Sequence, residues 1–237
     1  MMARLWAYRT ALTLIMLAGL FLSGCGSNQV IVQGEFPTPL IEKLDQTLGV
    51  YYEDKFKSHE IFDEAKSRGQ SDWRIKTGEA QIRLWDLIFS GVFSKTLKLA
   101  ERPSSEKPAE GVDLVIIPHI EELQYAIPSH TQIKVYEIWM RYRFELINTT
   151  GEPLGDWKMT AYGKTPQNLV MGIEGGQSKE EAINLAATMA LRDAGAHFVT
   201  SFREAEPIVL WLDGLTARED DPSKKKFSQP ESIELNQ

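Results

Sequence analysis

Residues 136–146 alternate strictly between apolar and polar side chains. One set is Tyr136, Ile138, Met140, Tyr142, Phe144 and Leu146, and the other is Glu137, Trp139, Arg141, Arg143 and Glu145. A period of two is typical of a β-strand with one face in the core. The residues Asn148 to Gly151 favour a turn, and Trp157, Met159 and Ala161 then alternate with polar residues that include Tyr162. We therefore predict a long hairpin with one buried face.

Two other segments have the apolar spacing of helices. In residues 79–94 apolar side chains recur every three or four positions, and Thr77 is the expected N-cap. Residues 178–201 begin with Ser178 and Glu181, which have the spacing of a capping box. Short strands are predicted at 47–52, 59–64, 71–76, 95–99 and 112–117. At Pro118 either the pairing should loosen or the strand should bulge, because proline has no N–H. The order of elements predicts an α+β domain, a mainly antiparallel sheet with two helices packed on one face in two layers.

The N-terminal part has the order of a secretory signal. Arg4 and Arg9 precede residues 11–22, which carry no charge and are too few to span a bilayer. We predict a signal peptide at 1–24, and a tether at 25–40 because prolines and glycines follow without periodicity. A single α+β domain is expected at 41–215, with the apolar segment 207–215 returning to the core. A disordered polar tail is expected at 216–237.

The residues that end the apolar run are Leu22-Ser23-Gly24-Cys25, and Cys25 is the only cysteine. This sequence resembles the lipobox of bacterial lipoproteins. The resemblance implies cleavage between Gly24 and Cys25, a diacylglyceryl group on the Cys25 thiol and acylation of the new amino group. Two or more acyl chains hold a protein stably on a bilayer. In the sorting pattern of such lipoproteins, an Asp after the cysteine retains the protein in the inner membrane. Gly26 follows here, so the periplasmic face of the outer membrane is expected.

The charge of the chain narrows the choice of partners. Removal of residues 1–24, which contain Arg4 and Arg9 and no acidic residue, changes the formal net charge from −7 to −9. Nucleic-acid binding depends on neutralising phosphates with Lys and Arg, and the one basic cluster, residues 224–226, lies in the polar tail. We expect no nucleic-acid partner.

Candidate catalytic and metal-binding residues are few. His119 and Glu121 would lie on the same side of a strand, but a metal site needs three or four ligands and the other histidines are scattered. The chain lacks a Gly-x-Ser-x-Gly elbow. We therefore expect no catalytic residues, no metal, no cofactor and no enzymatic activity.

Four side chains on the polar faces of the hairpin are the candidates for contact with a partner. They are Trp139, Arg141, Arg143 and Tyr162. Trp and Arg are enriched at the centres of protein–protein contacts. The alternative is that another element of this chain covers the same face.

Two further resemblances bear on function. Gly49 to Tyr52 (Gly-Val-Tyr-Tyr) and Tyr136 to Trp139 (Tyr-x-x-Trp) resemble segments of uncharacterised proteobacterial envelope lipoproteins. The order of elements and the anchor are similar, at the level of fold, to the lipopolysaccharide-assembly lipoprotein. We expect a non-enzymatic, periplasm-facing lipoprotein that docks onto another envelope protein as an accessory subunit of a transport or assembly system. The alternatives are a lipid- or glycolipid-binding module, which needs an apolar cavity, and a hydrolase, which needs a converging Ser, His and acid.

Overall fold

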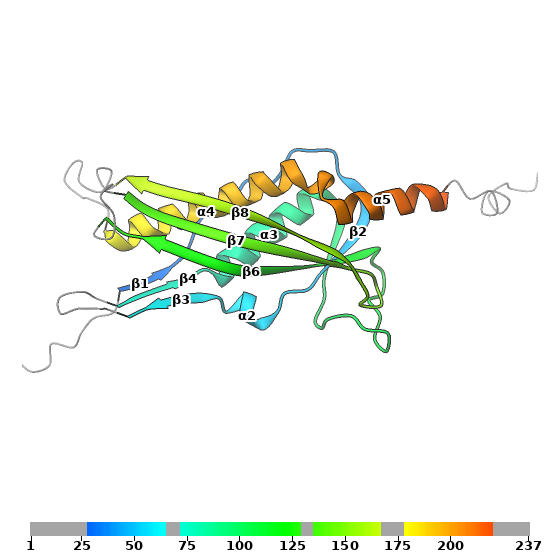
Figure 1. Ribbon diagram of the computed structural model, residues 1–237, viewed down its shortest axis with the longest axis horizontal. Coiled ribbons are helices and arrows are strands. Elements are labelled where there is room, and N and C mark those ends of the chain that lie inside the picture. Colours follow the sequence, from blue (N-terminus) through cyan, green and yellow to red (C-terminus); the bar gives the residue numbers. More distant parts are fainter. Residues whose placement is uncertain (1–27, 65–71, 129–134, 167–177, 220–237) are drawn as a thin grey trace, which may run out of the picture.

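The computed structural model describes residues 28–64, 72–128, 135–166 and 178–219 (Figure 1). The predicted signal peptide, the lipobox with Cys25 and the residues after 219 lie outside the described residues. The strands are β1 (Asn28–Ile31), β2 (Leu44–Val50), β3 (Glu60–Asp63), β4 (Trp73–Lys76), β5 (Phe93–Lys98), β6 (Leu114–Ala126), β7 (Val135–Ile147) and β8 (Pro153–Pro166). The helices are α2 (Asp54–Lys57), α3 (Gly78–Val92), α4 (Lys179–Ser201), the 3-10 helix η3 (Phe202–Glu204) and α5 (Glu206–Glu219).

The strands form two sheets. The larger has the order β5-β2-β6-β7-β8, and the smaller has the order β1-β4-β3. β7 and β8 pair antiparallel from Val135↔Pro166 to Ile147↔Pro153, which confirms the predicted long hairpin. β2 pairs parallel with both of its neighbours, and β1 pairs parallel with β4. Both sheets are therefore mixed, and the longest ladders of the larger sheet, β6–β7 and β7–β8, are antiparallel as the sequence predicted.

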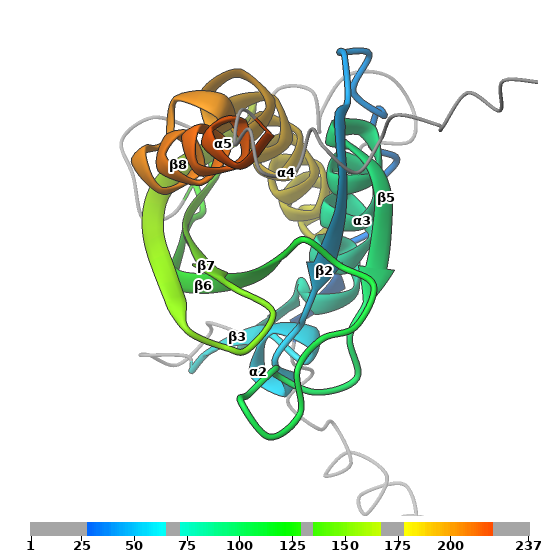
Figure 2. The same ribbon diagram turned by 90° about the vertical axis from the view of Figure 1, so that its right-hand side faces the viewer.

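Helices α3 and α4 pack on one side of the curved strands β6, β7 and β8 (Figure 2). All six predicted core residues of β7 are buried. Between sheet and helices they meet an aromatic cluster centred on Trp85, whose ring lies 4.9 Å from that of Phe144, 5.1 Å from that of Tyr142 and 5.5 Å from that of Phe198. The α+β class and the two-layer packing with two helices on one face are confirmed.

The N-terminal segment corrects a prediction. The sequence assigned residues 25–40 to a tether, but within the described residues 28–40 are part of the domain. Val30, Val32 and Phe36 are buried, and the Val32 N–H donates to the Lys76 carbonyl at 2.9 Å. The chain then follows α4, where Arg192 donates from two guanidinium nitrogens to the Glu35 carbonyl and the Thr188 hydroxyl donates to the Gln33 carbonyl. The folded domain therefore starts near Asn28 rather than near Ile41.

The disturbance expected at Pro118 lies two residues later in β6. Pro118 pairs with Phe144 inside a continuous β6–β7 ladder, and the register shift occurs two residues later, between Ile120 and Glu122. The Tyr51 N–H donates to the Ile116 carbonyl, so the backbone groups of Ile116 point toward β2. The backbone N–H and C=O groups of every second residue in a strand point to the same neighbouring strand, so those of Pro118 point the same way as those of Ile116. The β2–β6 ladder ends at Ile116. The nitrogen of Pro118 therefore faces the β2 side, where the β2–β6 ladder has already ended, and the missing N–H removes no hydrogen bond of that ladder.

The helix boundaries agree with the sequence in most details. The capping box of α4 is present: Ser178 Oγ accepts from the Glu181 N–H, and Glu181 accepts from the Ser178 N–H. Thr77 precedes α3 but its side chain makes no capping bond. The segment 207–215 forms most of α5 and buries Pro207 and Ile208, while Leu210 is 62% exposed. α5 continues to Glu219, so residues 216–219, which the sequence assigned to the disordered tail, are helical. No helix in the described part of the chain is long and apolar enough to cross a membrane.

Candidate functional site

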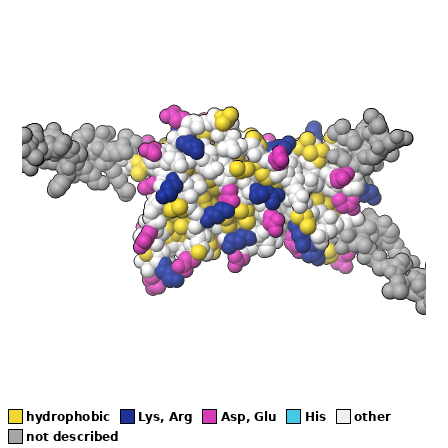
Figure 3. Space-filling model, turned by 180° about the vertical axis from the view of Figure 1, so that it is seen from behind, with side chains coloured by type: hydrophobic (Ala, Val, Ile, Leu, Met, Phe, Trp, Pro, Cys, Tyr) yellow, Lys and Arg dark blue, Asp and Glu magenta, His cyan; other side chains and the backbone are white. Residues whose placement is uncertain are grey.

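The outer face of strands β6, β7 and β8 has no helix of the described residues over it (Figures 1 and 2). We call this surface the open face. Its members alternate with the core residues in each strand: His119, Glu121, Glu122 and Gln124 on β6; Glu137, Trp139, Arg141, Arg143 and Glu145 on β7; Asp156, Lys158, Thr160 and Tyr162 on β8. The opposite side of the molecule shows charges of both signs scattered among apolar patches (Figure 3).

An aromatic pair lies toward one end of the open face. Trp139 and Tyr162 are directly opposite each other in the β7–β8 ladder, and their ring centroids are 4.3 Å apart. Trp139 remains 46% exposed. The Tyr162 hydroxyl donates to Glu137 Oε1 at 2.6 Å. Burial, together with this carboxylate, raises the pKa of Tyr162 to about 12, so the hydroxyl stays protonated and holds the ring in place against Trp139.

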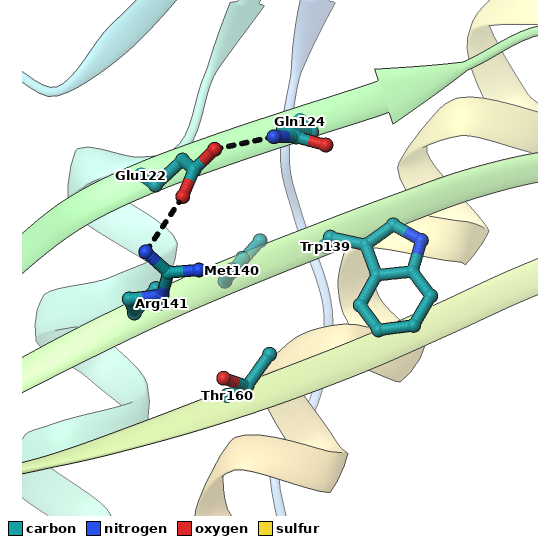
Figure 4. A pocket seen from close by; sticks show the side chains of 6 residues that line it. All are labelled: Glu122, Gln124, Trp139, Met140, Arg141 and Thr160. Carbon is teal, nitrogen blue, oxygen red and sulfur yellow. Dashed lines mark hydrogen bonds and ion pairs between the residues drawn. The ribbon is translucent and has the colours of Figure 1, made fainter.

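A shallow depression adjoins Trp139 (Figure 4). It is lined by Glu122, Gln124, Trp139, Met140, Arg141 and Thr160 and has a volume of about 90 Å³. Arg141 Nη1 lies 3.0 Å from Glu122 Oε2, and Gln124 donates to the other carboxylate oxygen of Glu122. Ligand pockets usually enclose ~300–1,000 Å³, so the depression suits a side chain of a partner better than a small molecule.

Ionic side chains occupy the other end of the open face. Glu145 accepts from both terminal nitrogens of Arg102, which lies in the loop after β5, and its Oε2 is 3.1 Å from His119 Nε2. Burial acts to raise the pKa of Glu145, but the bonds with Arg102 and His119 outweigh it, and the pKa lies below its usual value. His119 Nδ1 faces Glu53 Oε2 at 3.4 Å. These contacts bind the loop and the segment after β2 to the sheet.

The four residues predicted to face a partner all lie on the open face, but their environments differ. Trp139, Tyr162 and Arg141 cluster around the depression, where the Arg141 side chain is 52% exposed. Arg143 is 26% exposed and lies among Glu121, Glu145 and Asp156, at 3.5–3.9 Å. Arg143 is thus held within the ionic end, and the accessible candidates are the other three.

The structure adds residues that the sequence analysis missed. Glu122, Gln124 and Thr160 complete the depression, and Arg102 reaches Glu145 from a loop 43 residues away in sequence. Alternation on β6 could have placed Gln124 on this face. The register shift between Ile120 and Glu122, which puts Glu121 and Glu122 both near the surface, has no local signature in the sequence.

The metal hypothesis receives no support from the described residues. Among them, no group of three or more His, Cys, Asp or Glu side chains could hold a metal ion. Glu121 lies 2.9 Å from Lys158 Nζ instead of facing the imidazole of His119 as a second ligand. Glu121 thus pairs with Lys158, and His119 contacts Glu53 and Glu145, so both residues have partners within the protein.

A hydroxyl–imidazole pair occurs elsewhere, at Thr77 and His59. Thr77 Oγ1 lies 2.7 Å from His59 Nδ1 and also accepts from Gln81 Nε2 at 2.7 Å. Thr77 and Gln81 are completely buried, and burial lowers the pKa of His59. Because this hydroxyl is buried away from any substrate, we interpret the group as a structural link between α3 and the residues before β3.

Aromatic side chains pack closely together between the sheet and the helices around Trp85. Phe198 contacts the rings of Phe89, Phe144 and Phe202 at 5.0–5.5 Å, and Trp157 closes the same layer near β8. Among the described residues, these side chains occupy the space between sheet and helices around Phe198.

The chain matches no model of a protein family and no curated protein sequence. Several solved structures resemble it. A Xanthomonas campestris protein described with the family model DUF330 is 9% identical, with a TM-score of 0.48 over 81% of this chain and 99% of that chain. A minor lipoprotein from Acinetobacter baumannii is 10% identical, with a TM-score of 0.37, and the match covers 68% of this chain and 92% of that chain. Lipoprotein GNA1162 from Neisseria meningitidis is 11% identical, with a TM-score of 0.29, and the match covers 76% of this chain and 100% of that chain. At these scores, function has to be inferred from the residues of this chain.

Proposed function

We propose that this protein is a lipid-anchored, non-enzymatic component of the bacterial envelope that docks another envelope protein on its open face. Cys25, at the end of the lipobox Leu22-Ser23-Gly24-Cys25, carries the lipid. Gly26 in place of Asp supports the outer membrane, with the domain in the periplasm. The accessory role in a transport or assembly system is part of this proposal.

The observation that carries the docking role is Trp139. A tryptophan that is 46% exposed, in contact with the Tyr162 ring and flanked by Arg141, has the composition of an interface hot spot. Exposing this much aromatic surface to water is unfavourable, and a partner would remove it from water. The shallow, polar-rimmed depression is also typical of a protein interface, with an apolar centre and charged edges.

The glycolipid and hydrolase alternatives are less well supported. An acyl chain needs an apolar cavity, and around Trp85 the space between sheet and helices is occupied by packed aromatic rings. A hydrolase needs an accessible nucleophile, and Thr77, which meets a histidine, is fully buried.

The proposal is tested by photo-crosslinking in intact envelopes of the native host. A photoreactive phenylalanine analogue replaces Trp139 in one strain and Met189, which is 39% exposed on α4, in a control strain. We expect one discrete crosslinked product from position 139 and none from position 189. In the strain with the analogue at 139, adding Arg141→Glu should abolish that product, because it reverses the charge beside the depression while leaving the core unchanged.

Two outcomes would contradict the proposal. Only monomer at position 139 would remove the docking role, and a product that persists with Arg141→Glu would show that the contact is not specific to this surface. Lipidation is tested separately by mass spectrometry, because Cys25→Ser should leave an unprocessed chain without acyl groups.

A further inference from the structure

We infer that the end of the molecule formed by β1, β3 and β4 rests directly on the phospholipid bilayer, with Phe62 and Ile31 in the headgroup region. This inference rests on the proposed lipidation of Cys25. It differs from the sequence-based expectation, in which a tether at 25–40 lifts the domain off the lipid surface.

The length of chain between the lipid and the first strand is the main reason. β1 begins at Asn28, and only Gly26 and Ser27 separate it from Cys25. An extended chain spans at most ~3.6 Å per residue, so the Cα atoms of Cys25 and Asn28 can be no more than about 11 Å apart. The polar headgroup layer on each side of a bilayer is itself roughly 5–7 Å thick. The start of β1 therefore has to lie close to the headgroups.

β1 transmits this restraint to the whole domain because it is built into the fold. It pairs with β4 from Asn28↔Trp73 to Ile31↔Lys76, and the Asn28 N–H donates to the Asp72 carbonyl at 2.8 Å. Val30 and Val32 are 3% and 1% exposed. Releasing β1 as additional tether would break this ladder and expose both side chains, so the domain cannot move away from the lipid without partial unfolding.

The surface next to the anchor has side chains suited to a bilayer interface. Gln29, Arg74 and Phe62 form one row across the small sheet, on the face opposite the buried Val30 and Ile75. Phe62 is 52% exposed and Ile31, on the same outer face, is 47% exposed. Strands lie ~4.8 Å apart, so Phe62 is about 10 Å from Gln29. Aromatic and basic side chains are the usual residues at the membrane–water interface.

Both acidic residues of β3, Glu60 and Asp63, have partners in the fold. The Arg74 guanidinium carbon lies 5.1 Å from the centre of the Phe62 ring, and Arg74 Nη1 lies 2.6 Å from Glu60 Oε1. Asp63 accepts a hydrogen bond from the Tyr125 hydroxyl. The two acidic groups of β3 are thus partnered, which reduces repulsion from anionic lipids.

The arrangement also fixes which part of the molecule is farthest from the bilayer. The turn between β7 and β8 lies at the opposite end of the long axis from the start of β1 (Figure 1). β7 contains 13 residues, which at ~3.4 Å per residue is about 40 Å. Leu154, beside that turn and 39% exposed, should therefore stay clear of the membrane.

The test uses the full-length, lipidated chain in vesicles of phosphatidylethanolamine and phosphatidylglycerol. The native thiol is acylated, so Phe62→Cys, Ile31→Cys and Leu154→Cys each offer one site for an environment-sensitive fluorophore. Ile31→Cys leaves Phe62 in place. Part of the lipid carries a nitroxide quencher in its headgroup. We expect loss of fluorescence at positions 62 and 31, and no loss at position 154.

The outcomes separate this inference from the proposed function. A lipidated chain that sediments with the vesicles but keeps full fluorescence at positions 62 and 31 would overturn the contact and leave the anchor intact. Equal quenching at positions 62 and 154 would also overturn it, because the domain would then lie flat. A chain without acyl groups that fails to sediment would refute the anchor itself and the inference with it.

Discussion

Val32→Ala tests whether the N-terminal segment is part of the fold. Val32 is 1% exposed, and its N–H bonds to the Lys76 carbonyl at 2.9 Å. The substitution removes two methyl groups from the core and keeps the backbone bond. Each buried carbon is worth about 0.8 kcal/mol in transfer free energy, and the cavity adds to the loss. We expect the free energy of unfolding to fall by about 2 kcal/mol.

The measurement is urea unfolding of the chain from Gly26 onward, produced without lipid and followed by tryptophan fluorescence. With a urea dependence of roughly 2.5 kcal/mol/M, a loss of about 2 kcal/mol lowers the midpoint by about 0.8 M. Ile31→Ala is the matched control, because the neighbouring Ile31 is 47% exposed on the outer face of β1. It should change the free energy of unfolding by less than about 0.5 kcal/mol. If Val32→Ala has the same midpoint as the control, residues 28–40 are a free tether and the domain boundary near Asn28 is wrong.

Three further predictions concern stability. Ser178→Ala should lower the free energy of unfolding by about 1 kcal/mol in the same assay, because the α4 capping box is lost. Trp85→Ala should cost about 3–5 kcal/mol or prevent folding, and Trp85→Phe should cost less, because Trp85 is the centre of the aromatic cluster. The lowered pKa of Glu145 stabilises the fold above the pKa of the unfolded state, ~4.3, and that contribution disappears as the pH falls through the folded pKa. Glu145→Gln should therefore be less stable than wild type at pH 7, with the difference shrinking as the pH is lowered in parallel urea titrations.

The parts of the fold that were predictable from sequence are those with a local period. The alternation from Tyr136 to Leu146 identifies both the strand and its buried face. Successive side chains of a strand point to opposite faces, so a strand with one face in the core and one in water has alternating apolar and polar residues. Ser178 and Glu181 likewise mark the start of α4, since both capping bonds are made within three residues. Trp139, Arg141 and Tyr162 could be placed on one surface for the same reason.

The parts that were not predictable depend on contacts between distant residues. β1 pairs with β4, some 45 residues away, and the Arg192 side chain binds the Glu35 carbonyl across 157 positions. A segment with Gly34, Pro37 and Pro39 has no periodicity of its own, so its buried positions cannot be recognised without α4. Arg102 was missed for the same reason, because only the folded loop brings it to Glu145.

The two proposals together restrict the kind of partner. β7 runs from Val135, at the end near β1, toward Ile147 at the far end (Figure 1). Trp139 is four residues from its start, so at ~3.4 Å per residue it lies about 14 Å along the strand, whereas Glu145 lies about 34 Å along it. With β1 on the bilayer, the exposed aromatic pair is the membrane-proximal part of the open face and the ionic end is the distal part. A partner that contacts Trp139 must then reach the membrane-proximal part of the open face. This position favours a protein embedded in or attached to the same membrane over one that diffuses freely.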